Sequence, residues 1–217
     1  GLVGSEMCIR DSHSPEHLRD QYDVVIIGGG GHGLAAAHYL ANEHGITDVA
    51  VLEQRYIGHG GTGRNTSIIR SNYLTEEGAK FYQFSVDLYR DLSRQLDFNL
   101  FYSQRGHFTL AHSPASLRTQ RWRAEVNKHL GIDSEVVGPD FIQKTIPQID
   151  LTYGGHQPPI FGALYHPPGA IARHDAVAWA YARGADSKGV EIHQRTTVTG
   201  IEVADGAVTV SYTHLRA

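Results

Sequence analysis

Two apolar runs with a small-residue segment between them dominate the pattern of the chain. Val24 to Ile27 contains only Val and Ile, which is typical of a strand buried on both faces of a sheet. Val49 to Leu52 repeats this pattern, and Leu34 to Ala41 has the composition of a closely packed helix. Together these segments predict a strand–helix–strand unit whose two strands are parallel.

A long amphipathic helix is predicted after residue 75. Thr75 is a typical N-cap, and Glu76 and Glu77 favour the first helical turn, where a negative charge is stabilised. The apolar positions recur at helical spacing as far as Leu96. The expected buried stripe consists of Tyr82, Val86, Tyr89, Leu92 and Leu96.

Shorter elements are expected between residues 106 and 168. Gly106 to Ala111 predicts a strand, and Ser113-Pro114 begins a helix with proline at its first position. Gly131 is a typical residue for ending that helix. We expect short strands and turns in the segment from Pro139 to Pro168, which is rich in proline and glycine.

The last third of the chain predicts a helix, a strand and a hairpin. Asp175 is the expected helix cap, and Gly189 the residue that closes the helix. One apolar helix face is expected from Val177, Ala180, Tyr181, Gly184 and Ala185. Val190 to His193 would be the third parallel strand, beside the strand that ends at Glu53. Strands over 196–203 and 207–210, separated by Asp205-Gly206, predict a hairpin.

Composition narrows the class of protein. The formal net charge of −4 argues against a surface for nucleic acid or anionic membrane. The most apolar stretch, Val24 to Leu40, is too short and too interrupted by glycine to span a bilayer, and the residues before Asp23 do not have the pattern expected of a signal peptide. A single cysteine excludes a disulfide framework and indicates a reducing compartment, which we take as the cytoplasm. The histidines are scattered, so no metal site is predicted.

The turn after the first strand carries the most specific motif. Gly28, Gly30 and Gly33 have the spacing G-x-G-x-x-G between a predicted strand and a predicted helix. These glycines allow a tight turn, close approach of the backbone to a pyrophosphate, and close packing of helix on strand. Glu53 ends the second strand about twenty residues beyond the motif, where a carboxylate accepts hydrogen bonds from ribose hydroxyls. The pattern predicts dinucleotide binding.

A second glycine-rich loop, Tyr56 to Arg64, follows this unit. Such a loop can place backbone amides against a ligand, and Arg64 adds a fixed positive charge. The alternative is a flexible surface loop without a ligand.

Several stretches closely resemble the β subunits of heterotetrameric sarcosine oxidases, which belong to the FAD-dependent amine oxidases related to D-amino acid oxidase. They are YDVVIIGGGGHGLAAAHYLANEHGITDVAVLEQ, TGRNTSIIRSNYL, SQRG and ARHDAVAWAYARGAD. The resemblance implies an α/β fold, in which a Rossmann-like FAD-binding domain of the glutathione-reductase type is joined to part of an antiparallel-sheet substrate domain. It implies non-covalent FAD held by Gly28, Gly30, Gly31, His32, Gly33, Glu53, Gly61, Arg64, Asn65, Thr66 and Val198.

Two further residues receive roles from this resemblance. Arg70 would lie near the flavin and hold a substrate carboxylate, for which a guanidinium fork is well suited. The alternative for Arg70 is a structural ion pair. His174 would be joined covalently to FMN, a second flavin at the contact with the α subunit, because neutral imidazole is a nucleophile. Without the resemblance, His174 is an ordinary surface histidine.

The resemblance implies an enzyme that oxidises sarcosine (N-methylglycine) and passes electrons from FAD through FMN to O2, which yields hydrogen peroxide. Its partners would be the α, γ and δ subunits of a heterotetramer. We expect the FAD-binding strand–helix–strand unit and glycine loop over 13–75, a partial substrate region over 76–170, and a return to the FAD-binding domain over 171–210.

The resemblance covers residues 13–209, so the chain is expected to be incomplete. A catalytic lysine and the closing FAD segment would lie outside it, and these residues alone would bind FAD weakly and lack activity. Residues 1–12 and 211–217 resemble translated sequencing-adapter remnants, and we expect them to be non-native tails.

Three other functions remain open at this level. The first is a single-flavin FAD oxidase or dehydrogenase acting on another amine or amino acid, such as dimethylglycine, glycine or a D-amino acid. The second is an NAD-dependent dehydrogenase, in which the TGRNTSIIR stretch would have no role. The third is an FAD-stabilised structural subunit whose chemistry resides in a partner.

Overall fold

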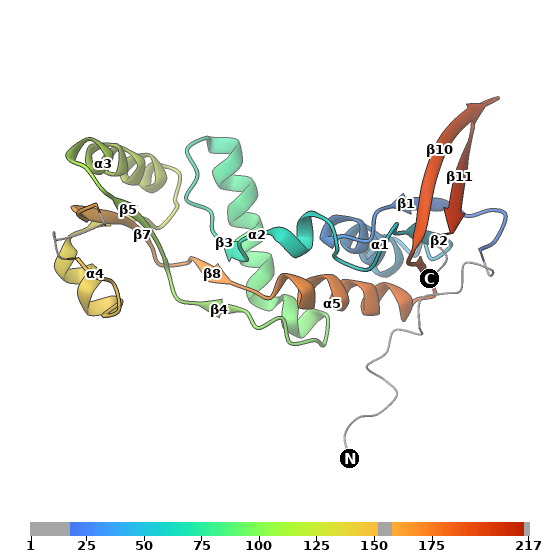
Figure 1. Ribbon diagram of the computed structural model, residues 1–217, viewed down its shortest axis with the longest axis horizontal. Coiled ribbons are helices and arrows are strands. Elements are labelled where there is room, and N and C mark those ends of the chain that lie inside the picture. Colours follow the sequence, from blue (N-terminus) through green and yellow to red (C-terminus); the bar gives the residue numbers. More distant parts are fainter. Residues whose placement is uncertain (1–17, 152–157, 215–217) are drawn as a thin grey trace, which may run out of the picture. The chain divides into compact units, whose positions relative to one another are not determined.

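The computed structural model describes residues 18–151 and 158–214, without the side chains of 211–214, as two compact units (Figure 1). Unit 1 contains the described residues up to Thr66, the segment Arg94–Leu100 and the chain from Arg173 onward. Unit 2 contains Ser67–Ser93 and the described residues of 101–172. The divisions predicted from the sequence lie after residues 75 and 170, and they differ from these units, which also assign Arg94–Leu100 to unit 1.

Unit 1 is built on a three-stranded parallel sheet in the order β1-β2-β9. Its strands are β1 (Val24–Ile27), β2 (Val49–Leu52) and β9 (Glu191–His193). Val24 pairs with Val49, and Ala50 pairs with Glu191 on the other side of β2. The prediction of a third parallel strand beside the Glu53 strand is therefore confirmed.

Two helices of unit 1, α1 (Gly31–Glu43) and α5 (His174–Asp186), pack against each other. A Cβ on Gly184 would lie 2.5 Å from His38 Nδ1, so this glycine permits the close approach. Helix α1 starts three residues earlier than predicted, inside the glycine motif. The prediction of Asp175 as the cap of α5 is wrong, because Arg173 is the N-cap and Asp175 lies in the first turn.

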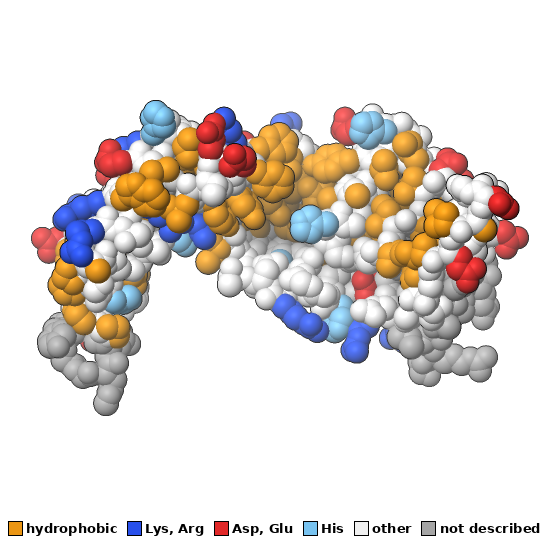
Figure 2. All heavy atoms as spheres, turned by 90° about the horizontal axis from the view of Figure 1, so that it is seen from above, with side chains coloured by type: hydrophobic (Ala, Val, Ile, Leu, Met, Phe, Trp, Pro, Cys, Tyr) orange, Lys and Arg blue, Asp and Glu red, His pale blue; other side chains and the backbone are white. Residues whose placement is uncertain are grey.

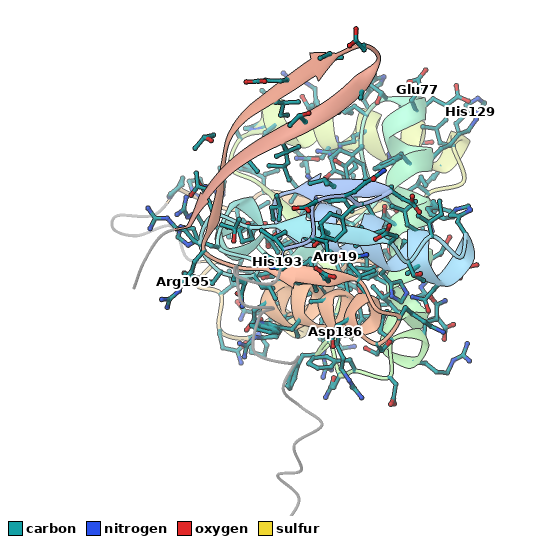
Figure 3. The ribbon with its side chains drawn as sticks, turned by 90° about the vertical axis from the view of Figure 1, so that its right-hand side faces the viewer. Arg19, Glu77, His129, Asp186, His193 and Arg195 are labelled. Atoms are coloured by element: carbon teal, nitrogen blue, oxygen red, sulfur yellow. The ribbon has the colours of Figure 1, made fainter. Side chains whose placement is uncertain are left out.

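The predicted hairpin is present as β10 (Thr196–Ala204) and β11 (Ala207–His214). Asp205 and Gly206 both have positive φ, 52° and 78°, as a tight hairpin turn requires. Arg195, also with positive φ, lies at the base of the hairpin (Figure 3). The strand was expected to end at Val210, but its backbone continues to His214, where it pairs with Thr196.

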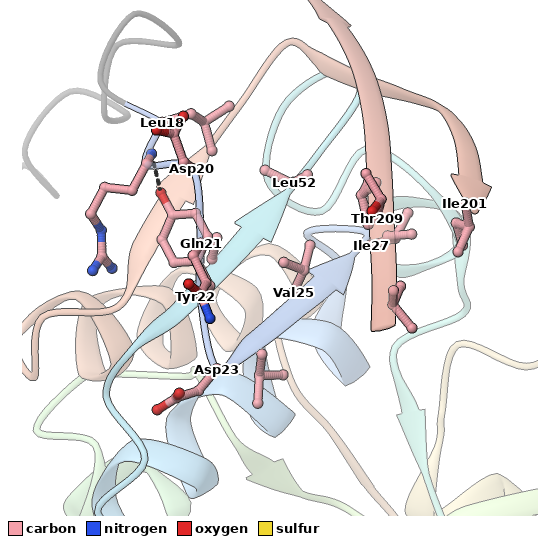
Figure 4. A pocket seen from close by; sticks show the side chains of 15 residues that line it. Leu18, Asp20, Gln21, Tyr22, Asp23, Val25, Ile27, Leu52, Ile201 and Thr209 are labelled. Atoms are coloured by element: carbon pink, nitrogen blue, oxygen red, sulfur yellow. Dashed lines mark hydrogen bonds between the residues drawn. The ribbon is translucent and has the colours of Figure 1, made fainter. Parts of the chain in front are cut away.

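One face of β1 differs from the sequence prediction. Val25 and Ile27 are 36% and 50% exposed, so β1 is not buried on both faces. The two side chains point into an open groove of about 580 Å³, whose opposite wall includes Ile201 and Val208 of the hairpin (Figure 4). A β-branched run therefore identified the strand correctly, but it did not establish what covers each face.

Unit 2 contains two small antiparallel sheets, each with three strands. The first has the order β3-β8-β4, with β3 (Ile68–Ile69), β8 (Ala170–Ile171) and β4 (Ser103–Gln104). The second has the order β5-β7-β6, with β5 (His107–Ala111), β7 (Gly162–His166) and β6 (Glu135–Val137).

The second sheet carries an apolar core with the short helix α4 (Pro139–Thr145). Ile142 of α4 is completely buried against Val137 and Ala163. This helix lies in the segment for which only strands and turns were expected, so that prediction is incomplete. Gly138 as N-cap and Pro139 at the first helical position were signals that could have identified it.

Helix α3 (Pro114–His129) begins and ends as predicted. Ser113 and Ser116 exchange side-chain and backbone hydrogen bonds of 3.1 and 3.3 Å, which forms a capping box. At the other end Gly131 has φ of 75° and donates to the Lys128 carbonyl, while Ile132 donates to the Asn127 carbonyl. This is a Schellman ending, for which the left-handed conformation of glycine is needed.

Helix α2 (Glu76–Gln95) starts after Thr75, whose hydroxyl accepts a hydrogen bond from the Gly78 N–H at 3.2 Å. Val86, Leu92 and Leu96 of its predicted stripe are buried, but Tyr82 is 39% exposed and stacks on Tyr73. Hydrophobic side chains reach the surface in both units (Figure 2). Within the described part of the chain, no helix has the length and apolarity needed to cross a membrane.

Candidate functional site

The turn after β1 has the geometry that the glycine motif requires. Gly28 has φ of 110°, which side chains other than glycine rarely adopt. A Cβ on Gly33 would lie 2.1 Å from the Gly28 carbonyl oxygen, so only glycine lets α1 pack this closely on the turn. The structural roles predicted for the first and third glycines are thus present.

The N-terminus of α1 carries a partial positive charge, and no side chain of its N-cap residue pairs with its backbone N–H groups. Its N-cap, Gly30, supplies no side-chain cap, and its first turn contains no acidic residue. Gly31 donates its N–H to Thr62 Oγ1 at 2.8 Å, whereas the N–H groups of Gly30, His32 and Gly33 have no partner among the described residues. Free amides together with the helix dipole are suited to holding a phosphate group.

Glu53 lies beside this turn at the end of β2. The side chain is only 7% exposed, and its oxygens accept hydrogen bonds from the Gly29 and Arg55 N–H groups, both at 2.8 Å. These bonds fix the carboxylate next to the glycine turn. Each oxygen can accept a further hydrogen bond, so the proposed ribose contact is compatible with these partners.

The glycine-rich loop over 56–64 is anchored to the same turn. Gly58 donates its N–H to the Gly29 carbonyl at 2.9 Å, and the short helix η2 (Gly61–Arg64) places Thr62 against Gly31. A Cβ on Gly63 would lie 2.7 Å from the Gly58 oxygen, so the loop is folded tightly. Thr62 was not predicted as a site residue, although a hydroxyl between the glycines of this loop was a usable signal.

The residues at the end of this loop and directly after it are exposed. Gly61, Arg64, Asn65 and Thr66 are all exposed. Arg64 Nη2 lies 3.5 Å from His59 Nε2, and Asn65 Nδ2 donates to the Thr62 carbonyl at 2.7 Å. The roles of these residues toward FAD stay predictions.

The base of the hairpin brings Val198 into the same unit. Thr196 donates its N–H to the Glu53 carbonyl, and Arg195 donates to the Arg55 carbonyl, both at 2.8 Å. The ladder of β10 is irregular between Val198 and Gly200, which interrupts backbone pairing there. An adenine contact through the Val198 backbone remains a prediction.

His174 is the first residue of α5 and is half-buried. Its neighbours Arg173 and Asp175 form an exposed ion pair, with Nε–Oδ1 and Nη2–Oδ2 distances of 2.9 and 2.5 Å. The side-chain hydrogen bonds from Arg173 lower the pKa of Asp175. The structure thus places His174 at a charged helix start, but it does not test a covalent flavin bond.

A polar cluster that was not predicted from the sequence lies at β9. The Glu191 carboxylate accepts hydrogen bonds from Tyr22 and Arg19 and lies 3.1 Å from Nε2 of the buried His193. Arg19 also pairs with Asp48 at 2.6 Å, so this cluster ties the segment before β1 to the sheet.

Arg70 lies in unit 2 and is half-buried. Its Nη1 donates to Asn72 Oδ1 at 2.8 Å, and the guanidinium carbon lies 4.4 Å from the centre of the Tyr73 ring. Nε and Nη2 make no hydrogen bond among the described residues. The structural ion pair considered as an alternative is therefore absent from this part of the chain.

The surroundings of Arg70 are positively charged. Burial, then the charge of Arg70, lowers the pKa of Arg123. Burial and the neighbouring bases Arg70, His166 and Arg123 lower the pKa of His107 to about 4. Burial also lowers the pKa of His166. Both histidines are therefore neutral near pH 7, and the net positive charge comes from the two arginines.

Unit 1 thus brings together the glycine turn, Glu53, the second glycine loop and the start of β10. Arg70 belongs to unit 2, where its side chain contacts Asn72 and Tyr73. No group of three or more His, Cys, Asp or Glu side chains that could hold a metal occurs in the ranges the structure describes.

A parallel sheet with a G-x-G-x-x-G turn, a helix start that fits a pyrophosphate and a carboxylate at the second strand defines a dinucleotide-binding α/β protein. The family model described as "FAD dependent oxidoreductase" (DAO) matches residues 23–217, and the chain belongs to this family. The prediction of FAD as the cofactor is thereby confirmed at the level of the family.

Curated relatives have more specific names. The chain is 48% identical over 190 residues to "Sarcosine oxidase subunit beta" of Rhizobium meliloti strain 1021, covering 88% of this chain and 45% of the relative. It is 47% identical over 186 residues to the protein of the same name from Arthrobacter sp, covering 84% and 45%. The chain therefore spans less than half the length of the relatives it matches.

Solved structures show the same fold. L-proline dehydrogenase from P. horikoshii aligns with a TM-score of 0.79 at 24% identity, covering 90% of this chain and 50% of that one. Glycine oxidase from Bacillus cereus aligns with a TM-score of 0.77 at 24% identity, covering 89% and 52%. These likenesses confirm the predicted fold class.

Proposed function

We propose that the complete protein oxidises sarcosine with FAD, as one subunit of a multi-subunit oxidase. The observation that carries this proposal is the likeness to three sarcosine oxidase β subunits at 41–48% identity. The glycine turn and the unpaired edge of Arg70 are the local features that this activity needs. The overall reaction converts sarcosine, water and O2 to glycine, formaldehyde and hydrogen peroxide.

The residues of unit 1 would bind FAD. The free amides at the start of α1 face the position suited to a pyrophosphate, and Glu53 is held beside them for a ribose hydroxyl. Gly61, Arg64, Asn65 and Thr66 would complete the contacts, with the Val198 backbone at the adenine. When bound, FAD supplies the ability to accept a hydride from the carbon next to the amine nitrogen.

Arg70 would orient the substrate. The Nε–Nη2 edge of its guanidinium can hold a carboxylate in two parallel hydrogen bonds, while Nη1 remains on Asn72. A fixed carboxylate restricts where the N-methyl group of sarcosine can lie, which is the positioning contribution that protein residues make to such a reaction. The hydrogen bond to Asn72 uses only Nη1, so the Nε–Nη2 edge of Arg70 has no partner among the described residues.

His174 would carry covalent FMN, through which electrons reach O2. His174 is half-buried at the start of α5, and neutral imidazole is a competent nucleophile. The other subunits would be α, γ and δ, as the resemblance implies. We also infer a cytoplasmic location, which is supported by the lack of cysteine in the sequence between the expected non-native tails.

The decisive experiment uses the complete native enzyme. It is digested, and the peptide that contains His174 is examined by mass spectrometry for bound FMN, while turnover of sarcosine is measured in parallel. Modified peptide with sarcosine turnover supports the two-flavin oxidase. An unmodified peptide in an enzyme that still contains FAD excludes His174 as the attachment site.

A second candidate is a single-flavin enzyme for another methylated amine. It is favoured by the likeness to rat mitochondrial dimethylglycine dehydrogenase, at 24% identity over 189 residues. That relative is less similar to this chain than the sarcosine oxidase subunits are, so a single-flavin enzyme is the second candidate function. A higher kcat/KM for dimethylglycine than for sarcosine, without FMN on His174, would favour it.

A further inference from the structure

The three residues after Arg70 are held in place by side chains from elsewhere in unit 2. Ser71 and Asn72 are completely buried although they belong to no helix or strand. Buried irregular backbone needs partners for its polar groups, and here side chains supply them. The Ser71 N–H donates to His166 Nε2 at 3.3 Å, so β7 holds the first residue of this segment.

Helix α3 holds the other two residues. Arg123 donates Nε and Nη2 to the Asn72 carbonyl, at 3.1 and 2.5 Å. Asn127, which is completely buried, donates Nδ2 to the Tyr73 carbonyl at 2.8 Å. The two side chains lie one helical turn apart on α3, so they face the same segment.

Asn72 and Tyr73 in turn set the guanidinium of Arg70. A guanidinium only donates, so the amide oxygen of Asn72 must face Arg70. The Tyr73 ring lies under the guanidinium and stacks on Tyr82, with ring centres 4.1 Å apart. The hydrogen bond from Nη1 to Asn72 and the contact of the guanidinium face with the Tyr73 ring together restrict both the tilt and the rotation of the Arg70 guanidinium.

We propose that Arg123 and Asn127 are positioning residues for Arg70, acting through Asn72 and Tyr73 to determine preference for a carboxylate substrate. They hold the backbone of the two residues whose side chains fix the guanidinium. Arg123 has a second effect, because its own charge adds to the field that an anion meets at Arg70. Asn127 has no charge, so its effect can arise only from positioning. The inference rests on the proposed role of Arg70 toward substrate.

The test uses the complete enzyme with its companion subunits and two ligands of nearly the same shape. Methoxyacetate carries a carboxylate, and methoxyacetamide is its neutral counterpart. The Kd of each is followed by the change in flavin absorbance, and the ratio of the two values gives the carboxylate preference. Steady-state kcat and KM for sarcosine are measured on the same samples.

Arg123→Met removes two hydrogen bonds and a charge, so it is expected to weaken methoxyacetate binding about tenfold. Asn127→Leu removes one hydrogen bond and is expected to weaken it about fivefold. Methoxyacetamide binding and kcat should change less than about twofold, because the effect is on the carboxylate contact. Arg123→Lys keeps one donor and should retain most of the preference. Arg118→Met removes an exposed arginine from the same helix and is the matched control, expected to behave as wild type.

A double-variant cycle tests the route of the effect. In an Arg70→Lys background, Asn127→Leu should cause little further loss, because the residue it positions has already been changed. Full additivity, or wild-type preference in both α3 variants, overturns the positioning inference while leaving the proposed function intact. If Arg70→Lys itself leaves the preference unchanged, Arg70 does not hold the carboxylate, and the proposed role of Arg70 fails first.

A second pair of variants keeps the test valid if the α3 variants fold poorly. Tyr73→Phe keeps the ring beneath Arg70 and should retain wild-type preference. Tyr73→Leu removes the ring and should weaken methoxyacetate about threefold, as expected for a partly exposed cation–π contact. Equal flavin content in both variants is the control for folding, and equal preference in both contradicts the inference.

Discussion

The two candidate anion sites of this protein are built by opposite means. In unit 1 the donors are backbone amides at the start of α1, and side chains are excluded by glycine. In unit 2 the donor is the side chain of Arg70, which needs Asn72 and Tyr73 to hold it. Backbone donors are fixed by the fold itself, whereas a flexible arginine must be fixed by neighbours.

This difference predicts which substitutions would disrupt each site. The backbone site should fail when any atom is added to the turn, and it should tolerate changes in distant side chains. The arginine site should fail gradually as its supports are removed one by one. Four predictions test this contrast, and they are ordered from the largest expected effect to the smallest.

Adding one methyl group to the glycine turn should be the most damaging change. In Gly33→Ala the new Cβ would lie 2.1 Å from the Gly28 carbonyl oxygen, which is backbone and cannot rotate away. We expect the free energy of unfolding to fall by about 3 kcal/mol, with loss of FAD from the purified protein. Thermal unfolding and flavin absorbance measure both effects.

Gly138→Ala is the matched control, because no atom lies within 4 Å of a Cβ at Gly138 and its backbone is extended, with φ of −84° and ψ of 173°. Unchanged FAD content in Gly33→Ala would show that close packing at the turn is unnecessary.

Changing the buried carboxylate beside the turn should have the next largest effect. Glu53→Gln replaces one acceptor with an NH2 group that faces a backbone N–H of Gly29 or Arg55. The loss of a charge-assisted bond should destabilise the FAD-bound protein by about 2 kcal/mol. Urea unfolding with and without excess FAD measures it. Glu43→Gln on the exposed end of α1 should behave as wild type, and equal midpoints for the two variants would contradict the prediction.

Arg70→Lys should weaken substrate binding without loss of the fold. Lysine keeps the charge but cannot hold a carboxylate at two points, so we expect the KM for sarcosine to rise about tenfold. Steady-state kinetics on the complete enzyme, with Arg118→Lys as control, provide the measurement. An unaltered KM would remove Arg70 from the substrate site.

The smallest expected effect concerns pH. The pKa of His107 falls to about 4 in the folded protein, first through burial and then through Arg70, His166 and Arg123. The unfolded chain therefore binds more protons between about pH 4 and the usual histidine value of about 6.5, so stability is complete above this window and falls as pH decreases through it. We expect His107 to contribute about 1 kcal/mol to this fall, reduced by partial exposure.

Replacing His107 with Leu should flatten the pH dependence of urea unfolding within that window. His129→Gln, an exposed histidine of the same unit, is the control and should leave the slope unchanged. Because His166 is also shifted downward, some dependence should persist in the His107 variant. A slope identical to wild type would show that His107 keeps an ordinary pKa.

The sequence by itself determined the features that depend on neighbouring residues. The glycine turn, the capping box at Ser113 and the ending at Gly131 follow from allowed φ values and local hydrogen bonds, so they could be predicted. One wrong prediction also had a local cause. Helix α4 was missed because its proline and glycine were interpreted as turn signals rather than as the start of a helix.

Only the tertiary structure decided what surrounds each side chain. Exposure of one face of β1 depends on the hairpin almost 180 residues later in the sequence, and the neighbours of Arg70 come from α3 and β7. Backbone conformation is dictated by sterics within a few bonds, whereas burial and charge depend on residues that are distant in sequence and meet only after folding. For this reason the backbone site could be predicted from sequence, and the supports of Arg70 could not.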